Sequence, residues 1–402
     1  MVSLIAYTYY NNPWRMESGD DVRVHTILSS LAKTHRVVVF NLSGLVEKRS
    51  VNLYDNVVYV SLPRRLYGFI SRLFKWSRHY DLNPLIKLTH YFDELLVAVV
   101  LSREIKRARV LVVFGPRSLF SFTIRLLGAK RTTIIYDPLA NYAQTLYLKS
   151  RKNPLSLLKY GLYLALHKLE VRASDIVIYP SRVDSENAGR MFKPKKTIIM
   201  PNPPPVCYNS LEEYLELRSQ RIDYTKPYFI LLAGGRGKIN EEAIKLTINV
   251  FNNFPPEKFK LIITGPWQDM KKYVKNQSIE LLGVVPREKL KELLAIADYG
   301  LSPIFTHAAG TFLKTLAYIS AGLNIIASPY GVIGLDINSK IKVYLARNKH
   351  EYANIITKII HNTKTKDITS KSHSIILCKD LSSKIESIIS YIKNNINTKY
   401  VK

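Results

Sequence analysis

Short apolar segments alternate with longer amphipathic segments along the whole chain. The apolar segments of the first half lie at residues 4–9, 36–41, 57–62, 110–114, 132–136, 175–179 and 197–200. Those of the second half lie at residues 228–233, 260–264, 279–282, 299–303, 324–327 and 342–345. Unbroken runs rich in Val, Ile and Tyr, with helical patterns between them, are typical of parallel strands buried on both faces. The two series predict an α/β protein with two doubly wound, Rossmann-like domains.

A proline-rich stretch separates the two series. The run Pro201-Asn202-Pro203-Pro204-Pro205 can continue neither a helix nor a central strand. We therefore predict an N-terminal domain at residues 1–203 and a C-terminal domain at residues 204–379. Residues 380–402 read as an amphipathic helix with a polar tail.

The two cysteines are far apart in the sequence. Cys207 and Cys378 show neither the pattern of a disulfide framework nor the spacing of a metal site, which favours a reducing compartment. The chain does not begin with a basic-then-apolar leader, and no apolar run reaches the roughly 20 residues of a membrane span. These features predict a cytoplasmic protein that is not integral to a membrane.

The charge is strongly positive, with 59 Lys and Arg against 31 Asp and Glu and a net charge of +28. Residues 1–200 carry 31 of the basic residues and 14 of the acidic ones. Such an excess favours a polyanionic partner, either a nucleotide, a nucleic acid or an anionic membrane surface. A general basic bias of the source proteome is the alternative. No nucleic-acid-binding motif is present and the cations are scattered, so we expect no nucleic-acid partner.

Two segments of the first half have the composition of membrane-contacting helices. Residues 64–79, RRLYGFISRLFKWSRH, place apolar and aromatic side chains on one helical face and Arg65, Arg72, Lys75 and Arg78 on the other. This pattern predicts peripheral contact with the inner face of a membrane, or else a packed helix with a solvated basic face. Residues 155–166, LSLLKYGLYLAL, are too short to span and predict a buried helix or part of the same membrane face.

The segment 302–334 predicts a phosphate site. It reads as a strand end, a small-residue turn, a helix, a Gly stop and a second strand. Backbone N–H groups at the start of that helix favour phosphate, with Gly310 and Thr311 in the turn and His307 nearby. Lys314 adds a positive charge one turn into the helix. Arg236 and Lys238 follow Gly235 on a loop after another strand, where open α/β sheets bind ligands.

With these segments placed, the chain resembles the two-domain GT-B glycosyltransferases of family 4. The resemblance rests on blocks in the family's order: HKLEVRASDIVIYPS (167–181), IIMPNPPP (198–205), LLAGGRGKINEEAI (231–244), LIITG (261–265), IELLGVVPREKLKELLAIADYGLSP (279–303) and GTFLKTLAYISAG (310–322). The first half matches loosely, through MESGDDVRVHTILSSLAKTHRVVVF. The resemblance implies two Rossmann-like domains that face a cleft, with a nucleotide-sugar in the second domain and an acceptor in the first.

These considerations give a set of expected site residues. The donor contacts are Gly235, Arg236, Lys238, Gly265, Val285, His307, Gly310, Thr311 and Lys314. Gly19, Asp20 and Asp21 are expected to contact the acceptor, and Asp137 and His25 are the catalytic candidates. We expect no cofactor, since the nucleotide-sugar is a substrate. We also expect no metal, because fixed cations and N–H donors can stabilise a leaving diphosphate, and the adjacent Asp20 and Asp21 point apart. The family's retention of anomeric configuration is the implied outcome.

The chain departs from the family pattern at one informative position. Ala317 stands where the family has a Glu thought to hold the donor ribose, and Ala309 replaces an upstream acid. The family-like geometry would place Ala317 toward the donor. Three interpretations follow: an active transferase with a lipid-linked or glycan acceptor, a non-catalytic scaffold of a glycosylation complex, or a nucleotide-sugar epimerase. An oxidoreductase is disfavoured, because no G-x-G-x-x-G follows the first strand.

Overall fold

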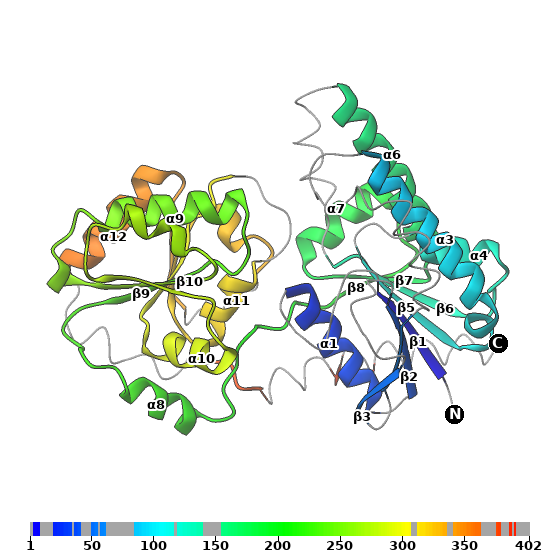
Figure 1. The fold of residues 1–402 in the computed structure, drawn as a ribbon, viewed down its shortest axis with the longest axis horizontal. Coiled ribbons are helices and arrows are strands. Elements are labelled where there is room, and N and C mark those ends of the chain that lie inside the picture. Colours follow the sequence, from blue (N-terminus) through cyan, green and yellow to red (C-terminus); the bar gives the residue numbers. More distant parts are fainter. Residues whose placement is uncertain are drawn as a thin grey trace. The chain divides into compact units, whose positions relative to one another are not determined.

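The computed structural model forms two compact units. It describes residues 3–8, 19–33, 36–41, 50–54, 57–61, 84–115, 119–139, 154–306, 312–335, 341–362, 375–378, 386–387 and 390. The first unit comprises Met1–Pro201 with Ile385–Lys402, and the second comprises Asn202–Lys384 (Figure 1). The chain therefore leaves the first unit after Pro201 and returns to it near its C-terminus.

An eight-stranded sheet forms the centre of the first unit, in the order β3-β4-β2-β1-β5-β6-β7-β8. Its strands are β1 (Ser3–Thr8), β2 (Arg36–Asn41), β3 (Ser50–Tyr54), β4 (Val57–Ser61), β5 (Val110–Phe114), β6 (Thr133–Asp137), β7 (Ile176–Tyr179) and β8 (Thr197–Ile199). Neighbouring strands are parallel except for the antiparallel edge pair β3–β4. The central strands are buried on both faces, as their unbroken apolar runs predicted.

Helices cover both faces of this sheet. They are α1 (Gly19–Ala32), α3 (Pro84–Arg107), α4 (Phe120–Leu126), α6 (Pro154–Ala173) and α7 (Arg182–Phe192). Apolar side chains of α3, α4, α6 and α7 join one core cluster with Tyr7, Val113 and Tyr136 of the strands. The helix α1 connects β1 to β2, whereas α4 connects β5 to β6 in the opposite direction along the sheet. Because parallel crossovers are right-handed, α1 lies on the face opposite to α4.

The second unit is built on a fully parallel six-stranded sheet, in the order β11-β10-β9-β12-β13-β14. Its strands are β9 (Tyr228–Leu232), β10 (Lys260–Thr264), β11 (Ile279–Gly283), β12 (Tyr299–Ser302), β13 (Asn324–Ala327) and β14 (Val343–Leu345). Its helices are α8 (Leu211–Ser219), α9 (Lys238–Phe251), α10 (Arg287–Ile296), α11 (Leu313–Ser320) and α12 (Lys349–Asn362), with short 3-10 turns η2 (Pro256–Lys258), η3 (Gln268–Tyr273) and η4 (Pro329–Val332). In Figure 1, α9 and α12 cover one face and α10 and α11 the other. The predicted pair of doubly wound α/β units is thus confirmed.

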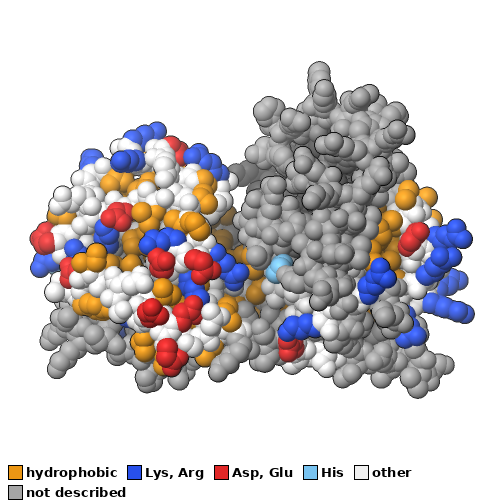
Figure 2. Space-filling view, turned by 60° about the horizontal axis from the view of Figure 1, so that its bottom comes forward, with side chains coloured by type: hydrophobic (Ala, Val, Ile, Leu, Met, Phe, Trp, Pro, Cys, Tyr) orange, Lys and Arg blue, Asp and Glu red, His pale blue; other side chains and the backbone are white. Residues whose placement is uncertain are grey.

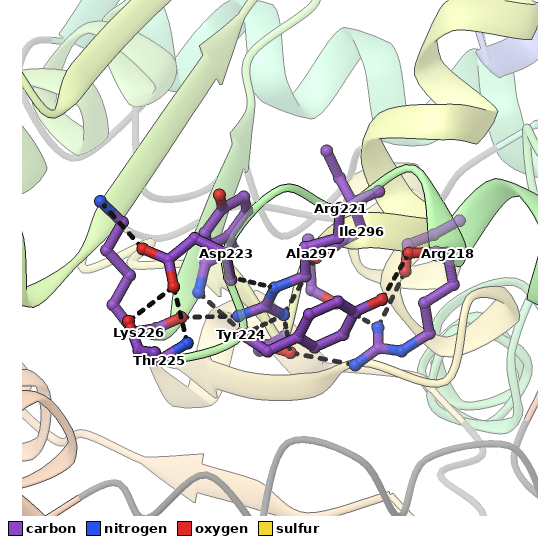
Figure 3. Close-up of polar contacts among 11 residues, drawn as sticks. Arg218, Arg221, Asp223, Tyr224, Thr225, Lys226, Ile296 and Ala297 are labelled. Atoms are coloured by element: carbon purple, nitrogen blue, oxygen red, sulfur yellow. Dashed lines mark hydrogen bonds and ion pairs between the residues drawn. The ribbon is translucent and has the colours of Figure 1, made fainter.

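A buried ion-pair cluster fixes α8 to the sheet of the second unit. Asp298, just before β12, accepts hydrogen bonds from Arg221 Nη1 at 2.7 and 2.8 Å and from the backbone N–H of Tyr228 at 2.8 Å. Arg218 Nη2 lies 3.3 Å from the same carboxylate, and Arg218 Nη1 donates to the Ala295 carbonyl at 2.9 Å. Figure 3 shows Arg218 and Arg221 beside Ile296 and Ala297. The acid in the family-like ADYGLSP block therefore has a structural role.

The structure contradicts the prediction that the two cysteines are unconnected. Cys207 and Cys378 form a disulfide, with their Cα atoms 5.2 Å apart. A parallel β-bridge between Tyr208 and Leu377 brings the segments together, and Cys378 N donates to the Tyr208 carbonyl at 2.8 Å. Sequence separation said nothing about this pairing, because docking of the segment 375–378 beside residue 208 is a tertiary event. The pairing also removes the argument from free cysteines for a reducing compartment.

Two other predictions have different outcomes. Residues 64–79 lie outside the described residues, as does most of the predicted C-terminal helix. Residues 155–166 fall within α6, but they are not buried all round, since Leu157, Leu158 and Leu162 are exposed. No helix in the described part of the chain is long and apolar enough to cross a membrane.

Candidate functional site

The sheet of the second unit reverses its strand order between β9 and β12. The chain proceeds outward from β9 to β10 and β11, then returns to place β12 on the other side of β9. The strands β9 and β12 pair only at Tyr299↔Phe229 and Gly300↔Ile230. Beyond that point the Tyr318 hydroxyl lies between them, accepting from Leu232 N at 2.9 Å and donating to the Leu301 carbonyl at 3.1 Å. Such a reversal, at the carboxyl ends of parallel strands, is where open α/β sheets bind ligands.

Gly300 makes room for this tyrosine. A Cβ atom at position 300 would lie 2.2 Å from the Tyr318 ring. Tyr318 is fully buried on α11, so its ring fills the space where the two strands separate. The side chain of Tyr318 and the absence of one at Gly300 therefore produce the separation of the two strands. This separation sets the distance between the loops that follow β9 and β12.

The loop after β9 carries three of the expected donor contacts. Gly235, Arg236 and Lys238 are all exposed, and Lys238 is the first residue of α9. Arg236 Nη2 pairs with Asp269 of η3 at 2.8 Å, and its guanidinium lies over the Trp267 ring, 5.4 Å from the centroid. Lys238 forms a 3.8 Å ion pair with Glu242 along the helix. Arg236 is thus held at the edge of the site, and Lys238 extends along an exposed helical face.

Lys314 is the best-positioned cation of the site. Its Nζ donates to Asn240 Oδ1 at 2.7 Å, and Asn240 Nδ2 donates in turn to the Gly235 carbonyl at 2.7 Å. This chain of hydrogen bonds ties α11 to the start of α9 across the strand reversal. Desolvation lowers the pKa of Lys314 to about 8. A poorly solvated ammonium next to two helix starts is an energetic match for a diphosphate, which would restore the lost interactions.

Gly265 allows the close packing of two loops at the carboxyl edge. Its φ is +117°, and a Cβ atom there would lie 2.0 Å from the Ala233 carbonyl oxygen. The same carbonyl accepts from Trp267 Nε1 at 2.7 Å. Only glycine fits this position, so Gly265 shapes the loops without offering a side chain. Val285 is half-buried and packs against the apolar cluster under β9 and β10.

A set of buried hydroxyl groups holds the start of α11. Thr315 Oγ1 donates to the Gly331 carbonyl at 2.8 Å and lies 3.1 Å from Ser302 Oγ. The Ser328 hydroxyl caps η4 and also donates to the Ile304 carbonyl. These contacts join the loops after β12 and β13 to the helix that carries Lys314.

His307, Gly310 and Thr311 lie outside the described residues. Ala317 is fully buried in the apolar core of the second unit, among residues such as Ile230 and Leu323. The expectation that Ala317 faces the donor is therefore not met, because α11 directs this position toward the core.

In the first unit, Asp137 belongs to a buried ion pair. It ends β6, is fully buried, and its Oδ2 accepts from Arg23 Nε at 2.9 Å. Arg23 Nη1 donates to the Met200 carbonyl at 2.7 Å, and Leu139 N donates to Asp137 Oδ1 at 2.9 Å. Burial raises the pKa of Asp137, and Arg23 opposes that rise. The ion pair connects α1 to the end of β6, and the bond to Met200 connects α1 to the residue that follows β8. Asp137 therefore has a structural role beside its predicted catalytic one.

The expected acceptor residues and the second catalytic candidate, His25, gather at the start of α1. Gly19 begins the helix, Asp20 and Asp21 occupy its first turn, and His25 lies half-buried one turn later. Burial, followed by the charges of Asp137 and Asp21, raises the pKa of Asp20 to about 6, while Arg23 acts in the opposite direction. The structure thus brings Asp20 and Asp137 together electrostatically at one edge of the sheet. Their roles, and that of His25, remain predictions.

Four further residues of these two regions escaped the sequence reasoning: Asn240, Trp267, Tyr318 and Arg23. Their residue types carry no local signal of function, and each is identified by contacts across long sequence separations. Among the described residues, no group of three or more His, Cys, Asp or Glu could hold a metal ion.

The comparisons with known proteins show the fold. No family model and no curated protein sequence matches the chain. Among solved structures, a sucrose-phosphate synthase from Thermosynechococcus elongatus is 12% identical, with a TM-score of 0.64 and coverage of 98% of this chain and 100% of that one. An alpha,alpha-trehalose 6-phosphate synthase from Burkholderia multivorans is 13% identical, with a TM-score of 0.64 and coverage of 100% and 97%. HepE from Anabaena, in complex with UDP and glucose, is 13% identical, with a TM-score of 0.61 and coverage of 99% and 100%. The chain shares the GT-B architecture with these proteins along its whole length, while membership of family 4 stays a prediction.

Proposed function

We propose that this protein is a glycosyltransferase that moves a sugar from a nucleotide-sugar to an acceptor bound by the first unit. The observation that carries the proposal is the Lys314–Asn240–Gly235 connection across the strand reversal of the second unit. It places a poorly solvated cation between the starts of two helices. A nucleoside diphosphate fits this arrangement, and the similarly folded HepE structure contains UDP and glucose.

The chemistry required of the second unit is stabilisation of a leaving diphosphate. Negative charge builds up on the diphosphate oxygens as the bond to the sugar breaks, and preorganised cations and N–H groups lower the energy of that state. Lys314 would interact with the diphosphate directly. Arg236 would do so after exchanging its exposed partner Asp269 for phosphate oxygens. In this proposal the fixed cations do the work of a metal ion, and retention of configuration follows the family resemblance.

The acceptor side is proposed to lie at the carboxyl edge of the first sheet. Asp20 has a pKa of about 6, so it is largely ionised at neutral pH and can accept a hydrogen bond or a proton from an acceptor hydroxyl. The excess of cations in residues 1–200 favours an acceptor with phosphate, such as a lipid-linked glycan at the inner face of a membrane.

The test is a two-stage assay. A calorimetric screen against nucleoside diphosphates and nucleotide-sugars identifies the donor, and the release of diphosphate is then measured with polyprenyl-phosphate glycans or with soluble sugars as acceptors. We expect one nucleotide to bind selectively and turnover to require an acceptor. Selective binding without turnover on any acceptor would favour the non-catalytic scaffold, and interconversion of a nucleotide-sugar without an acceptor would favour the epimerase. Failure of every nucleotide to bind would reject the proposal.

A further inference from the structure

The inner face of the helix α6 carries polar as well as apolar side chains. That face buries Tyr163, His167, Glu170 and Val171 against the rest of the unit. Glu170 accepts from the backbone N–H groups of Ser121 and Phe122 at 2.9 and 3.0 Å, and so caps α4. The polar side chains of this face therefore have internal structural roles.

The outer face of α6 is apolar. Leu158, Leu162, Ala165 and Leu169 follow one another at intervals of four, three and four residues, which places them along one stripe of the helix. All four are exposed, with Leu158 at 71%, Leu162 at 46% and Leu169 at 38%; the neighbouring Leu157 is 56% exposed. A row of leucines on the outer face of a packed helix is costly in water and marks a surface that meets a non-aqueous partner. We call these five residues the α6 ridge.

The helix that carries the ridge extends beyond the sheet, past the carboxyl ends of the strands. The 20 residues of α6 span about 30 Å, whereas the four residues of β7 span about 13 Å. Two residues join the C-terminus of α6 to the start of β7, so the excess length of the helix projects past the carboxyl ends of the strands. That is the edge where Asp137 and the start of α1 lie, and Figure 1 shows α6 projecting in this way.

Cations surround the C-terminal end of the same helical layer. The helix α4 contacts both α3 and α6, and Arg125 of α4 donates to the Ala173 carbonyl at the end of α6. The exposed cations of these helices and of the α4–β6 loop are Arg103, Lys106, Arg107, Lys130, Arg131 and Arg172. Among the described side chains of these elements, Glu104 is the one exposed acid. In Figure 2, hydrophobic side chains lie next to Lys and Arg side chains on the described surface of the first unit.

We propose that the α6 ridge is the surface through which the protein docks onto an anionic lipid bilayer. Leucines that insert at the headgroup boundary, together with cations that contact anionic headgroups, are the two components of peripheral membrane binding. A protein partner or a second copy would satisfy the leucines, but it would leave the one-sided positive charge without a role. The inference rests on the proposed function in one respect: the outer face of this helical layer runs from the cations, at the amino ends of the strands, to the projecting end of α6 at their carboxyl ends, where the proposed acceptor region lies.

The experiment is flotation of the full chain with vesicles of phosphatidylcholine, with and without phosphatidylglycerol. We expect the wild type to float with the anionic vesicles. The triple variant Leu158→Ser, Leu162→Ser, Leu169→Ser should lose flotation without losing stability, because all three side chains are already exposed. The matched control, Leu215→Ser, Ile222→Ser, Val284→Ser, changes three exposed apolar residues of the second unit and should float like the wild type. Replacing Arg103, Lys106 and Arg107 by Gln should weaken partitioning by on the order of 100-fold, since each cation near the surface contributes roughly fivefold.

Equal flotation of the wild type and the ridge variant would overturn the proposal. It would also be overturned if light scattering found a wild-type dimer that the ridge substitutions dissociate, because a second copy would then cover the ridge. Nucleotide calorimetry on the same proteins separates the two proposals. Loss of flotation with unchanged nucleotide binding supports both. Absence of nucleotide binding in every variant rejects the proposed reaction and leaves the flotation result to decide the docking surface.

Discussion

Lys314 is the residue on which donor binding should depend most. Replacing it by Ala should weaken the binding of the nucleoside diphosphate by about 10- to 150-fold, since a charge-assisted hydrogen bond contributes about 1.5–3 kcal/mol. Arg236→Ala should cost less, because Arg236 is exposed and already paired with Asp269. Calorimetry provides the measurement, with Lys258→Ala as the control, because Lys258 is an exposed lysine in η2, just before the amino end of β10.

The same residue gives a pH dependence with a defined sign. In the free protein the pKa of Lys314 is about 8, so the side chain is charged below pH 8 and increasingly neutral above it. Only the ammonium form attracts a diphosphate, so affinity should fall as the pH rises through about 8. Lys314→Ala should lack this dependence. An affinity that is flat from pH 7 to about 9.5 in the wild type would contradict the assignment.

Asp137 shows why a loss of activity is ambiguous at this scale. It neutralises the buried Arg23, so Asp137→Asn would leave a buried charge unpaired, at a cost of about 3–5 kcal/mol. An inactive Asp137→Asn protein would therefore reveal nothing about catalysis unless its stability were measured as well. Asp20, which is half-buried, is the better residue for testing acceptor chemistry.

At the scale of elements, the attachment of α8 depends on one carboxylate. Asp298→Asn should lower the free energy of unfolding by about 3–5 kcal/mol, because two buried guanidinium groups lose their counter-charge. Urea denaturation of the wild type and the variant measures this loss. Glu292→Gln removes the exposed ion pair with Lys289 and should change stability by less than about 1 kcal/mol. Equal effects of the two substitutions would show that the cluster in Figure 3 contributes little.

The helix α11 provides a second prediction at this scale. The family pattern has Glu at position 317, but here Ala317 lies in the core next to Tyr318. Ala317→Glu should therefore destabilise the second unit by several kcal/mol, since it buries a carboxylate without a partner. A thermal melt with and without nucleotide is the measurement, and Ala317→Ser serves as a small polar control. A Glu variant that is stable and binds nucleotide more tightly would show that position 317 reaches the donor.

At the scale of the whole molecule, the disulfide joins the two places where the chain enters and leaves the second unit. The sequence separation of 171 residues encloses nearly all of that unit in a covalent ring. Chain-entropy arguments give such a closure about 5 kcal/mol of stabilisation, as an upper limit. Reduction, or the double substitution Cys207→Ser and Cys378→Ser, should lower the unfolding midpoint of the second unit and leave that of the first unchanged. Calorimetric melting resolves the two transitions, and an unchanged melt after verified reduction would contradict the expectation.

The sequence by itself determined the two α/β units and the Gly-containing loops that follow their strand ends. Strand and helix periodicity are local properties, and a Gly-containing loop after a strand end can be recognised without knowing what lies beside it. For this reason the sequence predicted the loop that contains Arg236. It also predicted that Lys314 lies near the start of a helix.

Only the tertiary structure decided the remaining features, because each joins residues that are distant in the chain. Lys314 meets Asn240 across 74 positions, Tyr318 separates strands that start 71 residues apart, and Cys207 meets Cys378 across 171. The side of α6 on which its leucines are exposed was also set by contacts with distant residues. Its composition allowed either a buried helix or a membrane face, and the polar groups that cap α4 and pack beneath the helix fixed which side faces outward.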